Sequence, residues 1–156
     1  MTIRIVQVAT GNAGRIALGQ VIEDPRFELV GLVVSDPEKV GKDAGALADL
    51  ATTTGVIATD DLAGALAAKP DCVVYCALSE TLFFEALEDV KTCLAAGANV
   101  VATSPVRLRY PWGLLADSMM EPYDEIWREQ GVSLFVSGVG PGWANDLVPF
   151  FVASTS

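Results

Sequence analysis

The sequence predicts an α/β fold in which about six strands form a doubly wound parallel sheet within a single domain. Short apolar runs alternate along the chain with segments of helical periodicity, which is the pattern of successive strand–helix–strand units. Most of these runs are continuously apolar, as expected for strands that helices cover on both faces. With 156 residues, 51% of them hydrophobic, the chain is long and apolar enough to bury one core.

The first half of the chain opens with an apolar strand that passes through a glycine turn into a helix, which ends at Asp24-Pro25. Two more strand–helix units follow, and Asp60-Asp61 places carboxylates at the start of the third helix, where the helix dipole favours them. The predicted strands here are Ile3–Ala9, Phe27–Val34 and Val56–Ala58, and the predicted helices are Gly14–Glu23, Asp43–Leu50 and Leu62–Ala68.

The second half repeats this alternation, with Gly97 as the cap of the fourth helix and Gly131 at the end of the fifth. Val106–Gly113 is too short and too closely bounded by prolines for a helix, whereas Trp143–Ser154 is predicted to be a last helix. The predicted strands here are Asp71–Ala77, Asn99–Thr103 and Val132–Val136, and the other predicted helices are Glu80–Ala96 and Pro122–Gln130.

Composition limits the classes of partner. The net charge of −10 disfavours binding to nucleic acid or to an anionic membrane. No leader and no apolar run of membrane-spanning length is recognisable, and the three cysteines fit reduced core thiols, so we expect a cytoplasmic protein. The absence of histidine excludes an imidazole base and histidine metal ligands within this chain, and no metal site is predicted.

The glycine turn after the first strand predicts a phosphate-binding site. Gly11 permits the tight turn, Gly14 lets the backbone approach a pyrophosphate, and Ala17 is small enough for the helix to pack on the strand. The unpaired N–H groups of a helix N-terminus attract an anion. The sequence therefore predicts a Rossmann-type dinucleotide-binding domain; the alternative is a plain turn in a flavodoxin-like protein. The pyrophosphate is expected at Gly11, Asn12, Ala13, Gly14, Arg15 and Ile16.

The end of the second strand is where the adenosine ribose of a dinucleotide lies in such a domain. Asp36 fits a hydrogen bond to the ribose 2′-OH of NAD, while Ser35 tolerates the 2′-phosphate of NADP with help from Lys39 or Lys42. Asp36 fits an Asp-Pro turn equally well. The predicted cofactor is therefore NAD or NADP.

Two more strand ends converge on the same edge of the sheet. Small and hydroxyl-bearing residues there allow a flat nicotinamide ring to lie over the backbone, and the predicted cofactor contacts are Cys76, Ala77, Leu78, Ala102, Thr103 and Ser104. Beyond them, Arg107, Tyr110 and Trp143 are predicted to shape a pocket for a small-molecule substrate. No residue is assigned as catalytic acid or base.

Several of these segments resemble the dihydrodipicolinate reductase family. Gly11–Ala17 resembles its glycine turn, Gly41–Ala48 its Gly-x-Asp-x-Gly-Glu-Leu segment, and Ala102–Ser104 its Gly-Thr-Thr segment. Gly138–Trp143, with Asp146 and Pro149 after it, is more similar to a sister group that contains 2,4-diaminopentanoate dehydrogenase and amine dehydrogenases. The resemblance implies an NAD(P)-dependent oxidoreductase that transfers hydride to or from a C=N or C=O carbon.

The resemblance also implies a second domain for substrate and subunit contacts, and through it a homo-oligomer. We accordingly expect residues 3–137 to form the dinucleotide-binding domain and residues 138–156 to begin the connection to a substrate domain missing from this chain. Two departures stand out: Ser104–Arg109 lacks the carboxylate that amine dehydrogenases keep after the fifth strand, and Gly140 replaces an asparagine. The alternative function is a non-catalytic nucleotide-binding or sensing module of the same fold.

Overall fold

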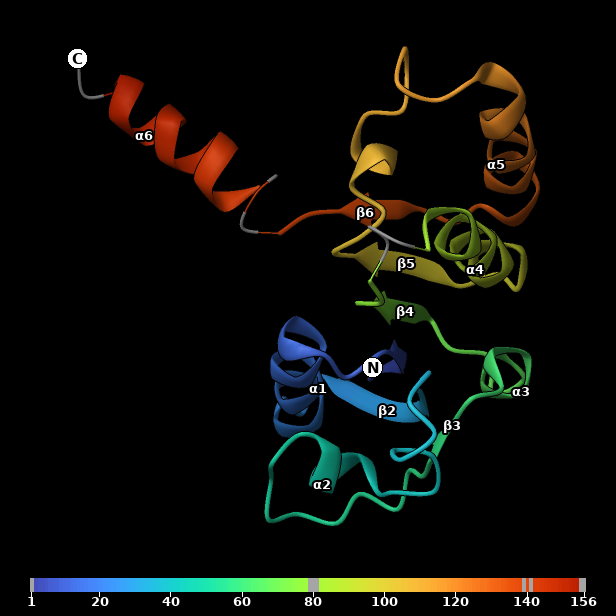
Figure 1. Cartoon of the computed structure of the whole chain (residues 1–156), viewed down its shortest axis with the longest axis vertical. Helices are drawn as coiled ribbons and strands as arrows, with labels where there is room; N and C mark the ends of the chain where they lie inside the picture. The colour runs from blue at the N-terminus through green and yellow to red at the C-terminus, as the bar shows by residue number, and fades with distance from the viewer. Residues whose placement is uncertain (1, 79–81, 139, 141, 155–156) are drawn as a thin grey trace.

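A computed structural model describes residues 2–78, 82–138, 140 and 142–154 of the chain. Six parallel strands form one sheet in the order β3-β2-β1-β4-β5-β6. This arrangement confirms the predicted doubly wound sheet, whose chain order reverses between β1 and β4 (Figure 1). The strands are β1 (Ile3–Val8), β2 (Phe27–Val33), β3 (Ala58–Thr59), β4 (Cys72–Tyr75), β5 (Asn99–Ala102) and β6 (Leu134–Val136).

Helices cover both faces of the sheet (Figure 1). Leu18 of α1 and Ala44 of α2 pack with Leu32 on one face, while α3, α4 and α5 cover the other face around Val73 and Tyr75. Among the described residues, no helix has the length and apolar character that crossing a membrane requires. The helices are α1 (Asn12–Glu23), α2 (Ala44–Leu47), α3 (Leu62–Leu66), α4 (Phe83–Ala95), α5 (Asp117–Gln130) and α6 (Val148–Ser154).

The predicted elements are present, with three corrections. The third strand was predicted at Val56–Ala58 but lies at Ala58–Thr59, because Ile57 pairs with Asp43 rather than with β2. The stretch predicted to lack a helix contains a one-turn 3₁₀ helix, η1 (Val106–Arg109). The predicted start of the fourth helix, Glu80, is not one of these corrections, because it lies outside the described residues.

The third correction concerns α5, which was predicted from Pro122 but begins at Asp117. Pro122 lies inside this helix and donates no backbone hydrogen bond there. The added first turn brings Met119 and Met120 against the core, and this apolar contact offsets the missing bond.

The last segment stands away from the sheet, as Figure 1 shows for α6. A π-helical turn, η2 (Trp143–Leu147), leads into α6, with Pro149 as the second residue of that helix. The guanidinium of Arg109 pairs with the carboxylate of Asp146, which links η1 to this turn.

Candidate functional site

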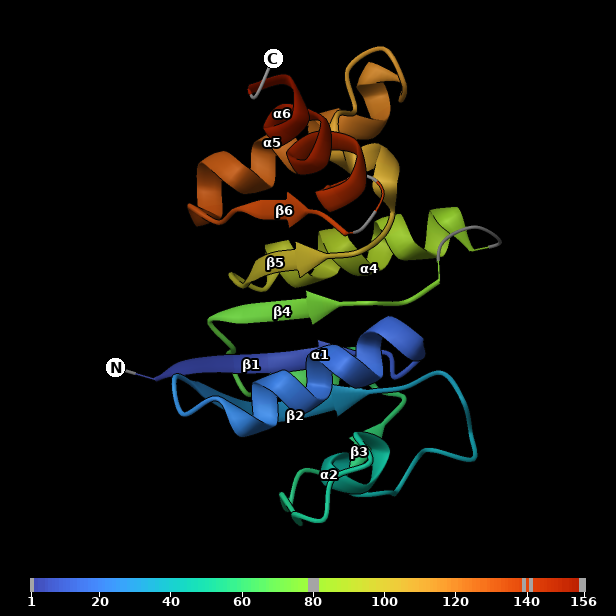
Figure 2. The same cartoon turned by 90° about the vertical axis from the view of Figure 1, so that its left-hand side faces the viewer.

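A cavity of about 490 Å³ lies where the carboxyl ends of β1, β2, β4 and β5 meet. Figure 2 shows the strand arrowheads pointing toward one edge of the sheet, where α1 also begins. This edge next to the reversal of strand order is where open α/β sheets bind ligands. The cavity is lined by Ala9, Thr10, Gly11, Asn12, Ala13, Val34, Ser35, Asp36, Lys39, Cys76, Ala77, Leu78, Thr103 and Ser104.

The N-terminus of α1 forms one wall of this cavity. Gly11 is the N-cap residue and no side chain caps the helix there. A Cβ added at Gly11 would have no atom within 4 Å, so the space before the helix is open. The helix therefore presents its first N–H groups and positive dipole end to the cavity, as an anion site requires.

The two glycines of the turn have different surroundings from those the sequence suggested. Gly14 does not line the cavity; a Cβ there would lie 2.3 Å from the carbonyl oxygen of Ala9 and 3.2 Å from the Cβ of Cys76. Gly14 thus allows α1 to pack closely on the loop after β1. The open space in front of the helix, which was predicted at Gly14, lies at Gly11 instead.

A buried polar residue, Gln7, fastens this turn from below. Its side chain is fully buried, and its amide nitrogen donates to the carbonyl oxygens of Ala9, at 3.2 Å, and Gly14, at 3.4 Å. Ala9 has a positive φ of 69°, which is uncommon for a residue with a side chain. Sequence reasoning missed Gln7, although a single amide within an apolar strand is a recognisable signal.

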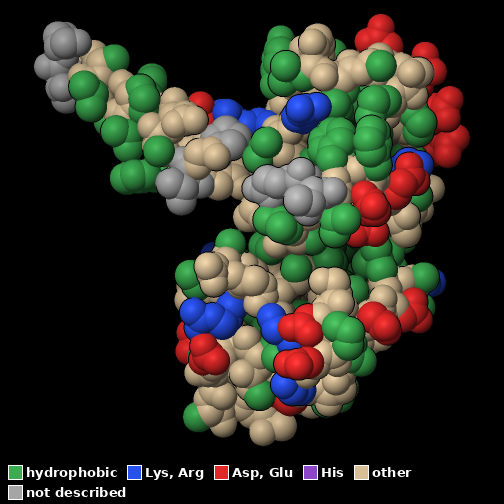
Figure 3. Space-filling model, viewed as in Figure 1, with side chains coloured by type: hydrophobic (Ala, Val, Ile, Leu, Met, Phe, Trp, Pro, Cys, Tyr) green, Lys and Arg blue, Asp and Glu red, His purple; other side chains and the backbone are tan. Residues whose placement is uncertain are grey.

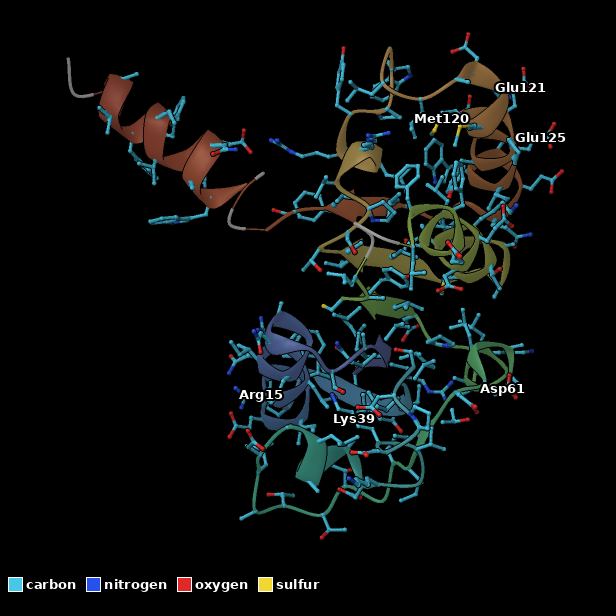
Figure 4. The ribbon with its side chains drawn as sticks, in the orientation of Figure 1. Arg15, Lys39, Asp61, Met120, Glu121 and Glu125 are labelled. Carbon is cyan, nitrogen blue, oxygen red and sulfur yellow. The ribbon has the colours of Figure 1, made fainter. Side chains whose placement is uncertain are left out.

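The predicted pyrophosphate contacts separate into two groups. Gly11, Asn12 and Ala13 line the cavity, while Gly14, Arg15 and Ile16 do not. The Arg15 guanidinium pairs with the Asp49 carboxylate, and Figure 4 shows Arg15 on the outer side of α1. Ile16 is 65% exposed.

The end of β2 brings opposite charges to the cavity. The Asp36 carboxylate accepts from the backbone N–H of Glu38 at 3.0 Å, so the Asp-Pro turn forms, yet Asp36 still lines the cavity beside Ser35. The Lys39 ammonium donates to the carbonyl and hydroxyl oxygens of Thr10 at 3.2 and 3.1 Å. A negative and a positive group therefore both flank the expected ribose position.

The ends of β4 and β5 form the opposite wall. Five of the six predicted contacts there line the cavity, and the exception is Ala102, which is buried in the core. The Ser104 hydroxyl donates to the carbonyl of Ala77, which holds the two strand ends together. Burial raises the pKa of the Cys76 thiol, so this residue stays a neutral thiol at neutral pH.

A second cavity, also of about 490 Å³, shares Thr103 and Ser104 with the first. Arg107, one of the predicted substrate residues, lines it and lies 5.2 Å from the ring centre of Phe83. The other two predicted substrate residues do not reach it: Tyr110 packs on Trp112, and Trp143 is 61% exposed. The second cavity is lined by Phe83, Phe84, Thr103, Ser104, Val106, Arg107, Leu114, Leu115, Ala116 and Met119.

Residues 3–104 match the protein family described as dihydrodipicolinate reductase, N-terminus. The chain is also 40% identical over 144 residues to an amine dehydrogenase of Streptomyces virginiae. That match covers 92% of this chain and 40% of the relative, so the chain spans well under half of the length of this relative.

Solved structures share the fold of this chain. The amine dehydrogenase of Mycobacterium smegmatis superposes with a TM-score of 0.77 at 28% identity, over 88% of this chain and 40% of that one. GenD2 from gentamicin A biosynthesis, solved in complex with NAD, superposes with a TM-score of 0.59 at 25% identity, over 86% of this chain and 34% of that one. Biliverdin reductase of Synechocystis, solved with biliverdin and NADP+, shares the fold with a TM-score of 0.62 at 23% identity, over 86% of this chain and 37% of that one.

Proposed function

The chain belongs to the family of the dihydrodipicolinate reductase N-terminus, and on this premise we propose that it is the NAD(P)-binding domain of an oxidoreductase. The match over residues 3–104 confirms the resemblance seen in the sequence. We further propose that the oxidoreductase transfers hydride to or from the C=N or C=O carbon of a small substrate. The same proposal assigns residues 138–156 to the connection with a substrate domain, through which subunits associate.

The observation that carries the proposal is the open N-terminus of α1 at the wall of the first cavity. A dinucleotide needs a seat for its pyrophosphate, and the uncapped N–H groups beside Gly11 offer one without a bulky side chain. The global charge of −10 would repel the diphosphate, so this local positive end is what the cofactor requires. The residues present therefore fit the cofactor.

The two ends of the cavity suit the two ends of a dinucleotide. Ser35, Asp36 and Lys39 would hold the adenosine ribose, and the walls after β4 and β5 would hold the nicotinamide. Held there in its reduced form, a nicotinamide would supply the hydride for the substrate carbon, and the substrate nitrogen or oxygen would take a proton from water. The chain contributes orientation, because Gln7 fixes the turn and Ser104 fixes the wall beside Ala77.

The test is titration of the chain with NADH and with NADPH, followed by cofactor fluorescence. At least one of them should bind. Gly11→Val should weaken that binding more than about tenfold, because the new side chain enters space that is open now and that the phosphates would need. The φ of −69° at Gly11 suits any residue, so the fold should persist.

Gly19→Ala is the matched control, since Gly19 lies in the same helix, outside the cavity, and a Cβ there also meets no atom within 4 Å. Its affinity for the cofactor should equal that of the unaltered chain. Absence of binding by either cofactor, or unchanged affinity in Gly11→Val, would refute the proposed cofactor site.

A further inference from the structure

We propose that the second cavity is the substrate pocket and that the substrate is an apolar carbonyl or imine compound that carries a carboxylate. This inference rests on the proposed function and adds to it the chemical class of the substrate. It depends on three observations: the cavity adjoins the proposed nicotinamide site, its walls are apolar, and a single guanidinium supplies its charge.

The position of the cavity comes from the end of β5. Thr103 and Ser104 line both cavities, so the two spaces adjoin at these residues. The Ser104 hydroxyl donates a hydrogen bond to the carbonyl oxygen of Ala77, on the wall where the nicotinamide is expected. A molecule in the second cavity would therefore lie next to the ring that delivers the hydride, as a reacting carbon must.

Besides the end of β5, three separate segments of the chain form the walls of the second cavity. Phe83 and Phe84 begin α4, Val106 belongs to η1, and Leu114 precedes α5. Phe84 is 69% exposed and Leu114 is 61% exposed, so the structure leaves large apolar side chains in contact with water. Figure 3 shows hydrophobic side chains gathered in this upper region of the molecule. Such a wall favours an apolar substrate body.

The charge of the cavity comes from Arg107. Of the described residues that line the cavity, Arg107 is the only lysine, arginine, aspartate or glutamate. Its guanidinium rests over the ring of Phe83 and, within the described part of the chain, has no carboxylate partner, unlike Arg109, which pairs with Asp146. A guanidinium binds a carboxylate through two parallel hydrogen bonds, whereas an ammonium group would find no anion in this lining.

These features define the substrate class. The carboxylate would pair with Arg107, the apolar body would contact the phenylalanines and Leu114, and the C=O or C=N group would lie toward Thr103 and Ser104. Reduction then adds a hydride from NAD(P)H to the carbon and a proton from water to the oxygen or nitrogen. The product is the corresponding hydroxy or amino acid together with oxidised NAD(P)+.

Two unreactive probes with the same apolar body and opposite charges test the charge preference. The chain is titrated by calorimetry with 3-phenylpropionate and with 3-phenylpropylamine, with and without saturating NADPH. The carboxylate should bind at least about tenfold more tightly than the amine, in line with a charge-assisted hydrogen bond at a partly solvated site. It should also leave NADPH bound, since the two occupy different cavities.

Variants at Arg107 test whether this residue causes the preference for the carboxylate probe. Arg107→Gln should bring the two affinities within about twofold, and Arg107→Glu should make the amine the better ligand. Arg109→Gln is the matched control, because Arg109 lies in the same 3₁₀ helix and outside the cavity, and it should keep the preference. Arg107 is exposed, so these variants should keep the unfolding midpoint of the parent chain.

Equal binding of the two probes, a preference for the amine, or an unchanged preference in Arg107→Gln would overturn the inference. Displacement of NADPH by 3-phenylpropionate would overturn it as well, because the carboxylate would then occupy the first cavity. The two proposals fail separately: a chain that prefers the carboxylate at Arg107 without binding NADH or NADPH refutes the proposed function, whereas a chain that binds a cofactor without that preference refutes the substrate class.

Discussion

The close approach of α1 to the loop after β1 gives a direct prediction for Gly14→Ala. The new Cβ would lie 2.3 Å from the carbonyl oxygen of Ala9 and 2.9 Å from its carbonyl carbon. Both contacts involve backbone atoms, so no side-chain rotation relieves them. Either α1 must move away from the sheet or Ala9 must leave its conformation at φ 69°.

The expected change in the free energy of unfolding follows from two opposing effects. Overpacking of this kind costs about 1–3 kcal/mol. Alanine favours a helix over glycine by about 0.5–1 kcal/mol, which offsets part of that cost. Gly14→Ala should therefore lower the free energy of unfolding by about 1–2 kcal/mol. Gly19→Ala has the propensity gain without the contacts and should raise it by about 0.5–1 kcal/mol.

Urea unfolding followed by circular dichroism measures both variants. The free energy of unfolding falls by about 2 kcal/mol per molar urea, so the urea midpoint of Gly14→Ala should fall by roughly 0.5–1 M, while that of Gly19→Ala rises. Binding of the cofactor should weaken in Gly14→Ala, since the displaced loop lines the first cavity. A Gly14→Ala midpoint equal to or above that of the parent would refute the packing role assigned to Gly14.

Three further predictions concern other contacts. The buried Tyr75 hydroxyl donates to Asp89 at 2.9 Å, so Tyr75→Phe should lower the free energy of unfolding by about 1 kcal/mol, and an unchanged urea midpoint would contradict this. Backbone N–H groups, that of Thr54 first, lower the pKa of Asp43, so its ionised form stabilises the fold above about pH 4. Asp43→Asn should therefore lower the midpoint at pH 7, and the difference should shrink as the pH falls below about 4; an equal difference at both pH values would argue against ionisation as the cause. Lys39→Gln should weaken NADPH about fivefold and NADH less, as fluorescence titration can measure, and equal losses would remove Lys39 from the ribose site.

The sequence determined the fold because its signals are local. Continuous apolar runs, glycine and proline boundaries and the early glycine turn depend on neighbouring residues, and together they placed all six strands in a parallel sheet. They also placed Gly11, Ser35, Asp36 and Thr103 at one edge, because parallel strands that alternate with helices end on the same side. The boundaries that failed, at β3 and α5, were set by partners distant in the chain or by core packing.

The roles of individual side chains were decided by tertiary structure. Arg15 was expected at the pyrophosphate but pairs with Asp49, because α1 turns that face toward the loop after α2. Gly14 and Gly11 could be told apart only once the position of Ala9 was known. The second cavity joins α4, η1 and the segment before α5, and no local pattern reports which side chains of such distant segments will share one space. A sequence determines the period and the order of its elements; which side chains meet depends on how those elements pack.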